Sequence, residues 1–86
     1  MYKVILDKQA EKFIKRLDGT SKNRIIKGIK ELAENPFLDT NVKKLRGMEN
    51  VYRKRVGDFR ILYEVNNGEL IILILKVGNR GEIYKK

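Results

Sequence analysis

An 86-residue chain has room for a single hydrophobic core, so residues 1–86 are expected to form one domain and a second domain is excluded. The sequence holds no cysteine and no histidine, which excludes a disulfide framework, a thiolate metal site and a histidine base that titrates near neutral pH. A formal net charge of +9 favours a polyanion as partner, either nucleic acid or an acidic protein.

Two features argue against a secreted or membrane protein. The N-terminal residues lack the apolar region of a signal peptide. The longest apolar run, residues 70–75, is far below the ~20 residues that a helix needs to cross a bilayer. Together with the missing cysteines, these features predict a soluble protein of the cytoplasm with no membrane partner.

The first part of the chain predicts a short strand followed by two amphipathic helices. Apolar and polar residues alternate over residues 2–7, and Asp7 fits the N-cap of a helix whose apolar residues repeat at i, i+3, i+4 and i+7. Thr20 or Ser21 can cap a second helix of the same kind, which ends at the Asn-Pro dipeptide of residues 35–36. Two such helices joined by a tight turn form an αα-hairpin.

The second part of the chain predicts strands. Residues 37–50 lack clear periodicity and are expected to be an irregular connection with a basic run. Side chains then alternate over residues 51–56 and 59–65, which are joined by the two-residue turn signal Gly57-Asp58. After a second turn, residues 69–77 are apolar on both faces, as expected of a central strand.

The predicted fold class is therefore α+β, with the element order β-α-α-β-β-β. The sheet is expected to be antiparallel, with the αα-hairpin packed on one of its faces. The hairpin turn places Arg55 opposite Arg60, and alternation places Arg53 on the same face as both.

A face with three arginines suggests phosphate binding. Like charges on adjacent strands repel one another, and a guanidinium group donates two parallel hydrogen bonds to a phosphate. The alternative is a solvated sheet face that keeps the protein soluble and blocks pairing at the sheet edge.

The residue types also restrict the chemistry. No carboxylate cluster has the spacing of a metal site, so neither a metal nor another cofactor is expected. The remaining reaction is metal-free RNA cleavage, in which the 2′-hydroxyl attacks the adjacent phosphate and guanidinium groups stabilise the developing negative charge. DNA lacks this nucleophile, so the substrate must be RNA.

Several motifs resemble the RelE toxins of the RelE/ParE superfamily, the toxin halves of toxin–antitoxin pairs. They occupy residues 44–48, 52–56, 57–65 and 77–80, followed by Tyr84, and the similarity covers nearly the whole chain. The resemblance implies a RelE-like microbial RNase-type fold. It also implies an endoribonuclease, an mRNA interferase that cuts message in the ribosomal A site and inhibits translation.

The resemblance implies roles for five residues on the active face. Arg53 and Arg60 would stabilise the transition state, Arg80 would stabilise or protonate the departing 5′-oxygen, and Tyr84 would orient and stack the substrate. Arg55 stands where the best-known relatives carry a lysine proposed as general base. Arginine stays protonated because its pKa is above ~12, so Arg55 is expected to act electrostatically while the ribosome or another group such as Glu82 accepts the proton.

Further basic residues and three partners complete the expectation. Lys43, Lys44, Arg46 and Lys54 are predicted to bind RNA or the ribosome, although each could instead be a solvated surface residue. The resemblance implies an acidic RelB-like antitoxin as partner, in addition to the ribosome with its A site and mRNA.

Two other functions remain open from the sequence. The chain could be a ParE-like toxin that shares the fold and inhibits DNA gyrase by binding it, without nuclease activity. It could also be a basic binding module without catalysis, in which case RNA binding would fall steeply with salt and no cleavage would occur.

Overall fold

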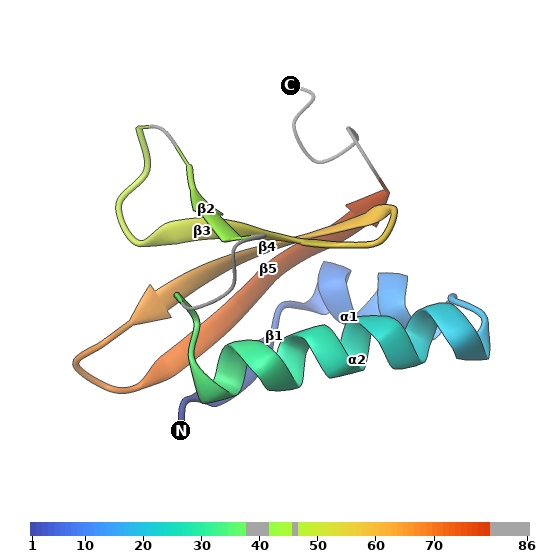
Figure 1. Cartoon of the computed structure of the whole chain (residues 1–86), viewed down its shortest axis with the longest axis horizontal. Helices are drawn as coiled ribbons and strands as arrows, with labels where there is room; N and C mark the ends of the chain where they lie inside the picture. The colour runs from blue at the N-terminus through green and yellow to red at the C-terminus, as the bar shows by residue number, and fades with distance from the viewer. Residues whose placement is uncertain (38–41, 46, 80–86) are drawn as a thin grey trace.

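The computed structural model describes residues 1–37, 42–45 and 47–79, and within them two helices cover one face of a five-stranded sheet (Figure 1). The predicted α+β fold is confirmed, with one additional short strand. The elements in chain order are β1 (Lys3–Leu6), α1 (Lys8–Lys15), α2 (Gly19–Glu34), β2 (Val42–Lys44), β3 (Val51–Val56), β4 (Phe59–Asn66) and β5 (Ile71–Asn79).

Aspartates cap both helices. The Asp7 carboxylate accepts a hydrogen bond from the Gln9 amide at 3.0 Å, as predicted, and satisfies one of the free amides of the first turn. The second cap is Asp18, whose carboxylate accepts from the Ser21 amide at 3.1 Å, so the prediction of Thr20 or Ser21 is wrong. Aspartate takes the position because α1 already ends at Lys15, which leaves Asp18 in extended conformation just before α2.

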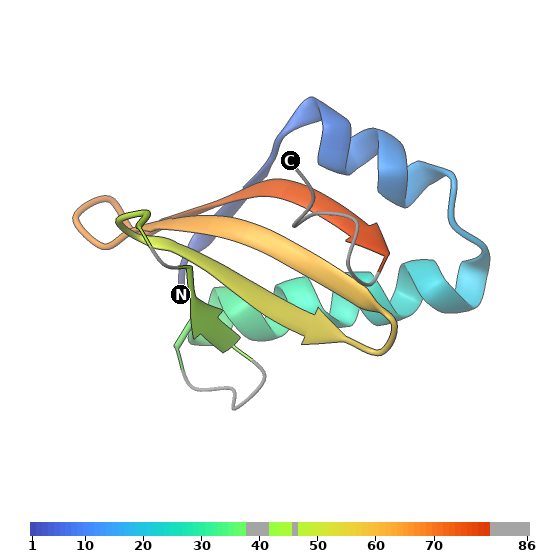
Figure 2. The same ribbon diagram turned by 90° about the horizontal axis from the view of Figure 1, so that it is seen from above.

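The sheet is mixed rather than antiparallel. Its strand order is β1-β5-β4-β3-β2, and β1 runs parallel to β5 while the other pairs are antiparallel (Figure 2). The predicted direction of β1 is therefore wrong. Alternating side chains identify the two faces of a strand but carry no information about its direction, which the path of the chain through α1 and α2 determines.

The strand β2 lies within the segment expected to be irregular. It pairs antiparallel with β3, so that Lys43 lies opposite Arg53 and Lys44 opposite Tyr52. A strand of three residues is too short to reveal a period of two, which explains why the sequence did not indicate it.

The β3–β4 hairpin has the predicted register. Val56 pairs with Phe59 and Arg55 with Arg60, across a two-residue turn in which Gly57 has a φ of +58°. Glycine adopts this left-handed conformation without the steric cost that a Cβ atom imposes.

The buried side chains form one core between the helices and the sheet. Its members come from both helices and from the two central strands, and include Ala10, Ile14, Ile25, Leu32, Ile61, Tyr63, Val65, Ile72, Ile74 and Val77. Burial of these side chains holds the helices against one face and leaves the other face open. Among the described residues, neither helix is long and apolar enough to span a membrane.

Candidate functional site

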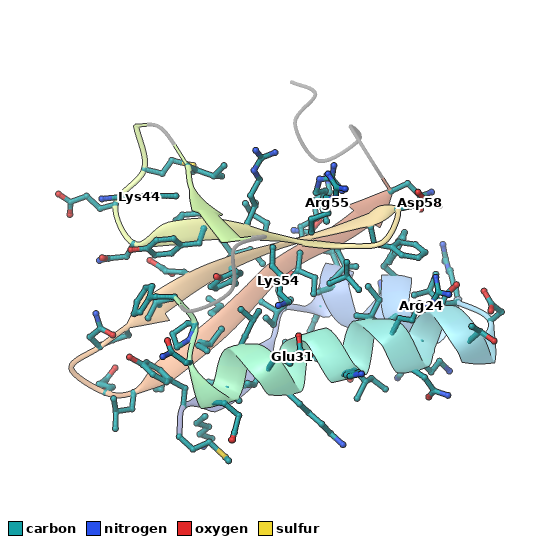
Figure 3. The ribbon with its side chains drawn as sticks, viewed as in Figure 1. Arg24, Glu31, Lys44, Lys54, Arg55 and Asp58 are labelled. Atoms are coloured by element: carbon teal, nitrogen blue, oxygen red, sulfur yellow. The ribbon has the colours of Figure 1, made fainter. Side chains whose placement is uncertain are left out.

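Three arginines lie on the sheet face that the helices leave open. On β3, Arg53 and Arg55 are two residues apart and therefore project to the same face. Across the hairpin, Arg55 pairs with Arg60 of β4, and Arg53 pairs with Leu62. Figure 3 shows Arg55 pointing away from the helices. We call this surface, made by Arg53, Arg55 and Arg60, the open arginine face.

The three arginine side chains differ in solvent exposure and in their contacts. Arg55 is exposed, whereas Arg53 and Arg60 are partly buried. The Arg60 guanidinium donates a hydrogen bond to the Phe59 carbonyl at 3.2 Å, which fixes its position along β4. Arg55 forms no ion pair with any carboxylate of the described residues. The face therefore combines a partly anchored arginine with an exposed one that can reach a ligand.

Placing Arg55 opposite Arg60 has an electrostatic cost. Like charges that face each other on neighbouring strands destabilise a sheet, by roughly 0.2–1 kcal/mol by analogy with measured cross-strand pairs. A phosphate between the two guanidinium groups removes this repulsion and gains charge-assisted hydrogen bonds. The chemistry that this part of the sheet offers is thus anion binding and stabilisation of negative charge.

Lys54 does not belong to the open arginine face. Its side chain is 2% exposed on the helix side of β3, and its ammonium group lies 3.2 Å from the Glu31 carboxylate on α2 (Figure 3). Lys54 lies between Arg53 and Arg55 in the strand, and because successive side chains of a strand point to opposite faces, it points away from both. This burial argues against the predicted direct contact between Lys54 and RNA.

Close packing of α2 on β3 explains how a lysine can be buried there. A Cβ atom at Gly28 would lie 2.9 Å from a Val56 methyl group and 3.5 Å from the Lys54 Cε atom. Glycine allows the helix to approach the strand, and the Lys54 aliphatic chain fills the space beside it. The ion pair with Glu31 then compensates for removing the ammonium group from water.

The structure describes only part of the other predicted site residues. Lys44 is exposed at the end of β2, and the backbone of Lys43 pairs with that of Arg53. The predictions for the Lys43 side chain, Arg46, Arg80, Glu82 and Tyr84 lie outside the described residues. β5 ends at Asn79, opposite Phe59, so the residue before Arg80 lies beside the strand that carries Arg60.

The structure also gathers charged residues that the sequence did not single out. Arg24, Lys27 and Glu31 line a groove between α2 and β3 together with Lys54. Their spacing of three and four residues is the signal that could have identified them, because it places side chains on one face of a helix. Within residues 1–37, 42–45 and 47–79, no group of three acidic side chains is close enough to hold a metal ion.

Comparisons with known proteins agree on one group of related toxins. Residues 4–84 match the family described as the ParE toxin of the type II toxin–antitoxin system parDE. Toxin RelE3 of Methanocaldococcus jannaschii is 35% identical over 85 residues, covering 95% of this chain and 94% of that protein. The mRNA interferase toxin RelE of Escherichia coli K12 is 29% identical over 89 residues, covering 99% of this chain and 92% of that protein.

A solved structure shows the same fold. The archaeal RelE–RelB complex from Pyrococcus horikoshii OT3 contains a chain that superposes with a TM-score of 0.83 at 33% identity, covering 94% of this chain and 97% of that chain. The matched family and the named relatives together cover nearly all of the sequence. The chain therefore belongs to the RelE/ParE toxins of type II toxin–antitoxin systems.

Proposed function

We propose that this toxin is a ribosome-dependent endoribonuclease that cleaves mRNA in the ribosomal A site and thereby inhibits translation. The observation that carries the proposal is the open arginine face, where Arg55 and Arg60 pair across the hairpin and Arg53 lies on the same side. The name of the E. coli relative, an mRNA interferase toxin, supports the same activity.

The reaction needs no metal in this proposal. The 2′-hydroxyl of one nucleotide attacks the adjacent phosphorus, and the bond from phosphorus to the 5′-oxygen breaks. The products are a 2′,3′-cyclic phosphate and a 5′-hydroxyl end. Negative charge increases on the phosphoryl oxygens in the transition state, and Arg53, Arg55 and Arg60 stabilise it as preorganised hydrogen-bond donors.

Proton transfer requires groups other than these three arginines. Arginine remains protonated at neutral pH, so Arg55 does not serve as the base that accepts the 2′-hydroxyl proton. A ribosomal group or Glu82 takes that role, Arg80 protonates or stabilises the departing 5′-oxygen, and Tyr84 stacks on a base of the substrate.

The proposal includes the partners. Lys43, Lys44 and Arg46 bind phosphates of the ribosome or the message. An acidic RelB-like antitoxin binds the toxin, as supported by the RelE–RelB complex with a similar chain and by the net charge of +9. Activity on ribosomes places the protein in the cytoplasm.

The name of the matched family favours a second candidate, a ParE-like toxin that inhibits DNA gyrase by binding. Pulse labelling of cells after induction separates the two. We expect incorporation of labelled amino acids to fall first, while DNA synthesis continues initially. Early loss of DNA synthesis with intact message would favour gyrase, and purified protein would then inhibit DNA supercoiling by gyrase.

A further inference from the structure

A second cationic surface lies on the helix side of β3. It is a groove of about 270 Å³ between one stripe of α2 and the end of the β3–β4 hairpin. The charged residues and the turn glycine that line it are Arg24, Lys27, Glu31, Lys54, Arg55 and Gly57. Figure 3 shows Lys54 and Glu31 pointing toward each other between the strand and the helix.

The charges of the groove are unequally compensated. The ammonium group of Lys54 neutralises Glu31 at 3.2 Å, so the one carboxylate of the groove opposes anion binding only weakly. Arg24 and Lys27, both exposed, form no ion pair with any described carboxylate. The exposed carboxylate of Asp58 lies in the hairpin turn but does not line the groove, so the end of the groove near the turn still carries a net positive charge.

The local geometry directs this charge toward the turn. The Arg24 guanidinium lies against the turn: its Nη1 atom would be 3.8 Å from a Cβ atom built on Gly57. Lys27 is one helical turn further along the same face of α2. A guanidinium and an ammonium group one turn apart suit two neighbouring oxyanions of a phosphate chain.

Arg55 connects the groove with the open arginine face. It is part of the groove lining, while its side chain points away from the helices (Figure 3). A polyanion that contacts Arg60 and Arg55 on the open side can therefore continue around the hairpin edge to Arg24 and Lys27. An extended phosphate backbone has the repeated charge that such a path requires.

We propose that the groove between α2 and the β3–β4 hairpin is a second phosphate-binding site that holds an RNA backbone through Arg24 and Lys27. The inference rests on the proposed function for the choice of RNA as the polyanion. The phosphates come from the ribosome or from the message, and binding measurements with each RNA distinguish these sources.

The test compares two double variants that remove the same charge. Arg24→Ala/Lys27→Ala changes the groove, and Lys12→Ala/Lys30→Ala changes exposed lysines of α1 and α2 that do not line it. Binding is measured with a labelled single-stranded 20-nucleotide RNA and with vacant ribosomes over a series of salt concentrations. Circular dichroism confirms that each variant is folded, as expected because alanine favours helix.

We expect the groove variant to bind about tenfold more weakly to at least one of the two RNAs, the equivalent of two lost phosphate contacts. For the single-stranded probe, the slope of log K against log salt falls by about 1.4. The control variant is expected to keep most of its affinity. A loss confined to ribosomes identifies ribosomal RNA, and a loss confined to the probe identifies message.

Equal losses in the two variants would overturn the inference, since they would show a general charge effect. The inference would also be overturned if the wild-type protein bound a glutamate-rich peptide but not RNA, and if only the groove variant bound this peptide more weakly. Because the readout is binding, it is independent of cleavage. The groove variant could bind RNA more weakly while the wild-type protein shows no cleavage. That result would contradict the proposed function, but the inference that the groove binds RNA would still hold.

Discussion

Two neighbouring cationic residues of β3 lie on opposite faces of the sheet and differ in burial and in charge partners. Lys54 faces α2, is 2% exposed and pairs with Glu31, whereas Arg55, the next residue, lies exposed on the open face opposite Arg60. A buried ammonium group needs a carboxylate partner, while exposed guanidinium groups tolerate like-charged neighbours because water and salt screen them. Position on the pleat therefore separates the structural cation from the cations available to phosphate.

Removing charge on each side of β3 gives the largest expected contrast. Arg60→Ala should slow message cleavage about 10²–10³-fold, the usual cost of losing one preorganised donor to the transition state. Lys54→Met, which removes a charge from the covered side, should cleave at close to the wild-type rate once toxin saturates the ribosomes, because any weaker binding at the groove then has no effect on the rate. Single-turnover cleavage on programmed ribosomes measures both. Similar losses of cleavage rate in the two variants would show that the two faces of β3 do not differ in function.

Truncating neighbouring apolar residues of β4 compares the stability of the two faces. Ile61 is fully buried under the helices, while Leu62 is partly buried on the open side. Ile61→Ala should lower the free energy of unfolding by about 2–5 kcal/mol because it leaves a cavity in the core. Leu62→Ala should cost less than half of that value. Urea denaturation measures both, and equal costs would show that the open face is covered in solution.

The Lys54–Glu31 pair allows a sharper test of the covered face. Glu31→Ala removes the carboxylate and leaves the buried ammonium charge, so it should destabilise the fold. The cost should be about 1–2 kcal/mol, below that of a fully buried pair because Glu31 is 53% exposed. Lys54→Met removes the charge itself and should be neutral or stabilising. Thermal unfolding of the two variants decides this, and the reverse ranking would contradict it.

Asp18 lies at the corner between the helices, outside both faces, and should produce the smallest effect. Hydrogen bonds from the Ser21 side chain and backbone lower the pKa of Asp18 below its ordinary value of 3.8. A lowered pKa stabilises the folded protein above the unfolded-state pKa, and this contribution disappears as the pH falls through the folded value. The melting-temperature difference between wild type and Asp18→Ala should therefore shrink below pH 4. A difference that persists in acid would contradict this account.

Much of the fold could be predicted because local patterns determine it. The period of two in β3 and β4, with the Gly57-Asp58 turn between them, predicted the pairing of Arg55 with Arg60 that the structure shows. The alternation of side chains in β4 predicted that Ile61, Tyr63 and Val65 lie on the face that the helices cover, as the core shows. The direction of β1 could not be predicted, because it depends on the whole path of the chain.

The site was harder to predict because it depends on packing between distant segments. The sequence places Lys54 among basic neighbours, and only the approach of α2 at Gly28 buries it beside Glu31. In the same way, Arg24 and Lys27 line a groove only because α2 packs beside β3. Alternation in β3 does contain part of this information, since it assigns Lys54 to the side opposite Arg53 and Arg55.

The proposed activity of the open arginine face is cleavage of message in the ribosomal A site. Its most direct test adds the purified toxin to ribosomes with an occupied P site and an empty A site, and maps the message ends by primer extension. We expect a cut within the A-site codon that is absent from free message and lost in Arg60→Ala. Intact message, alongside an active control toxin, would contradict it.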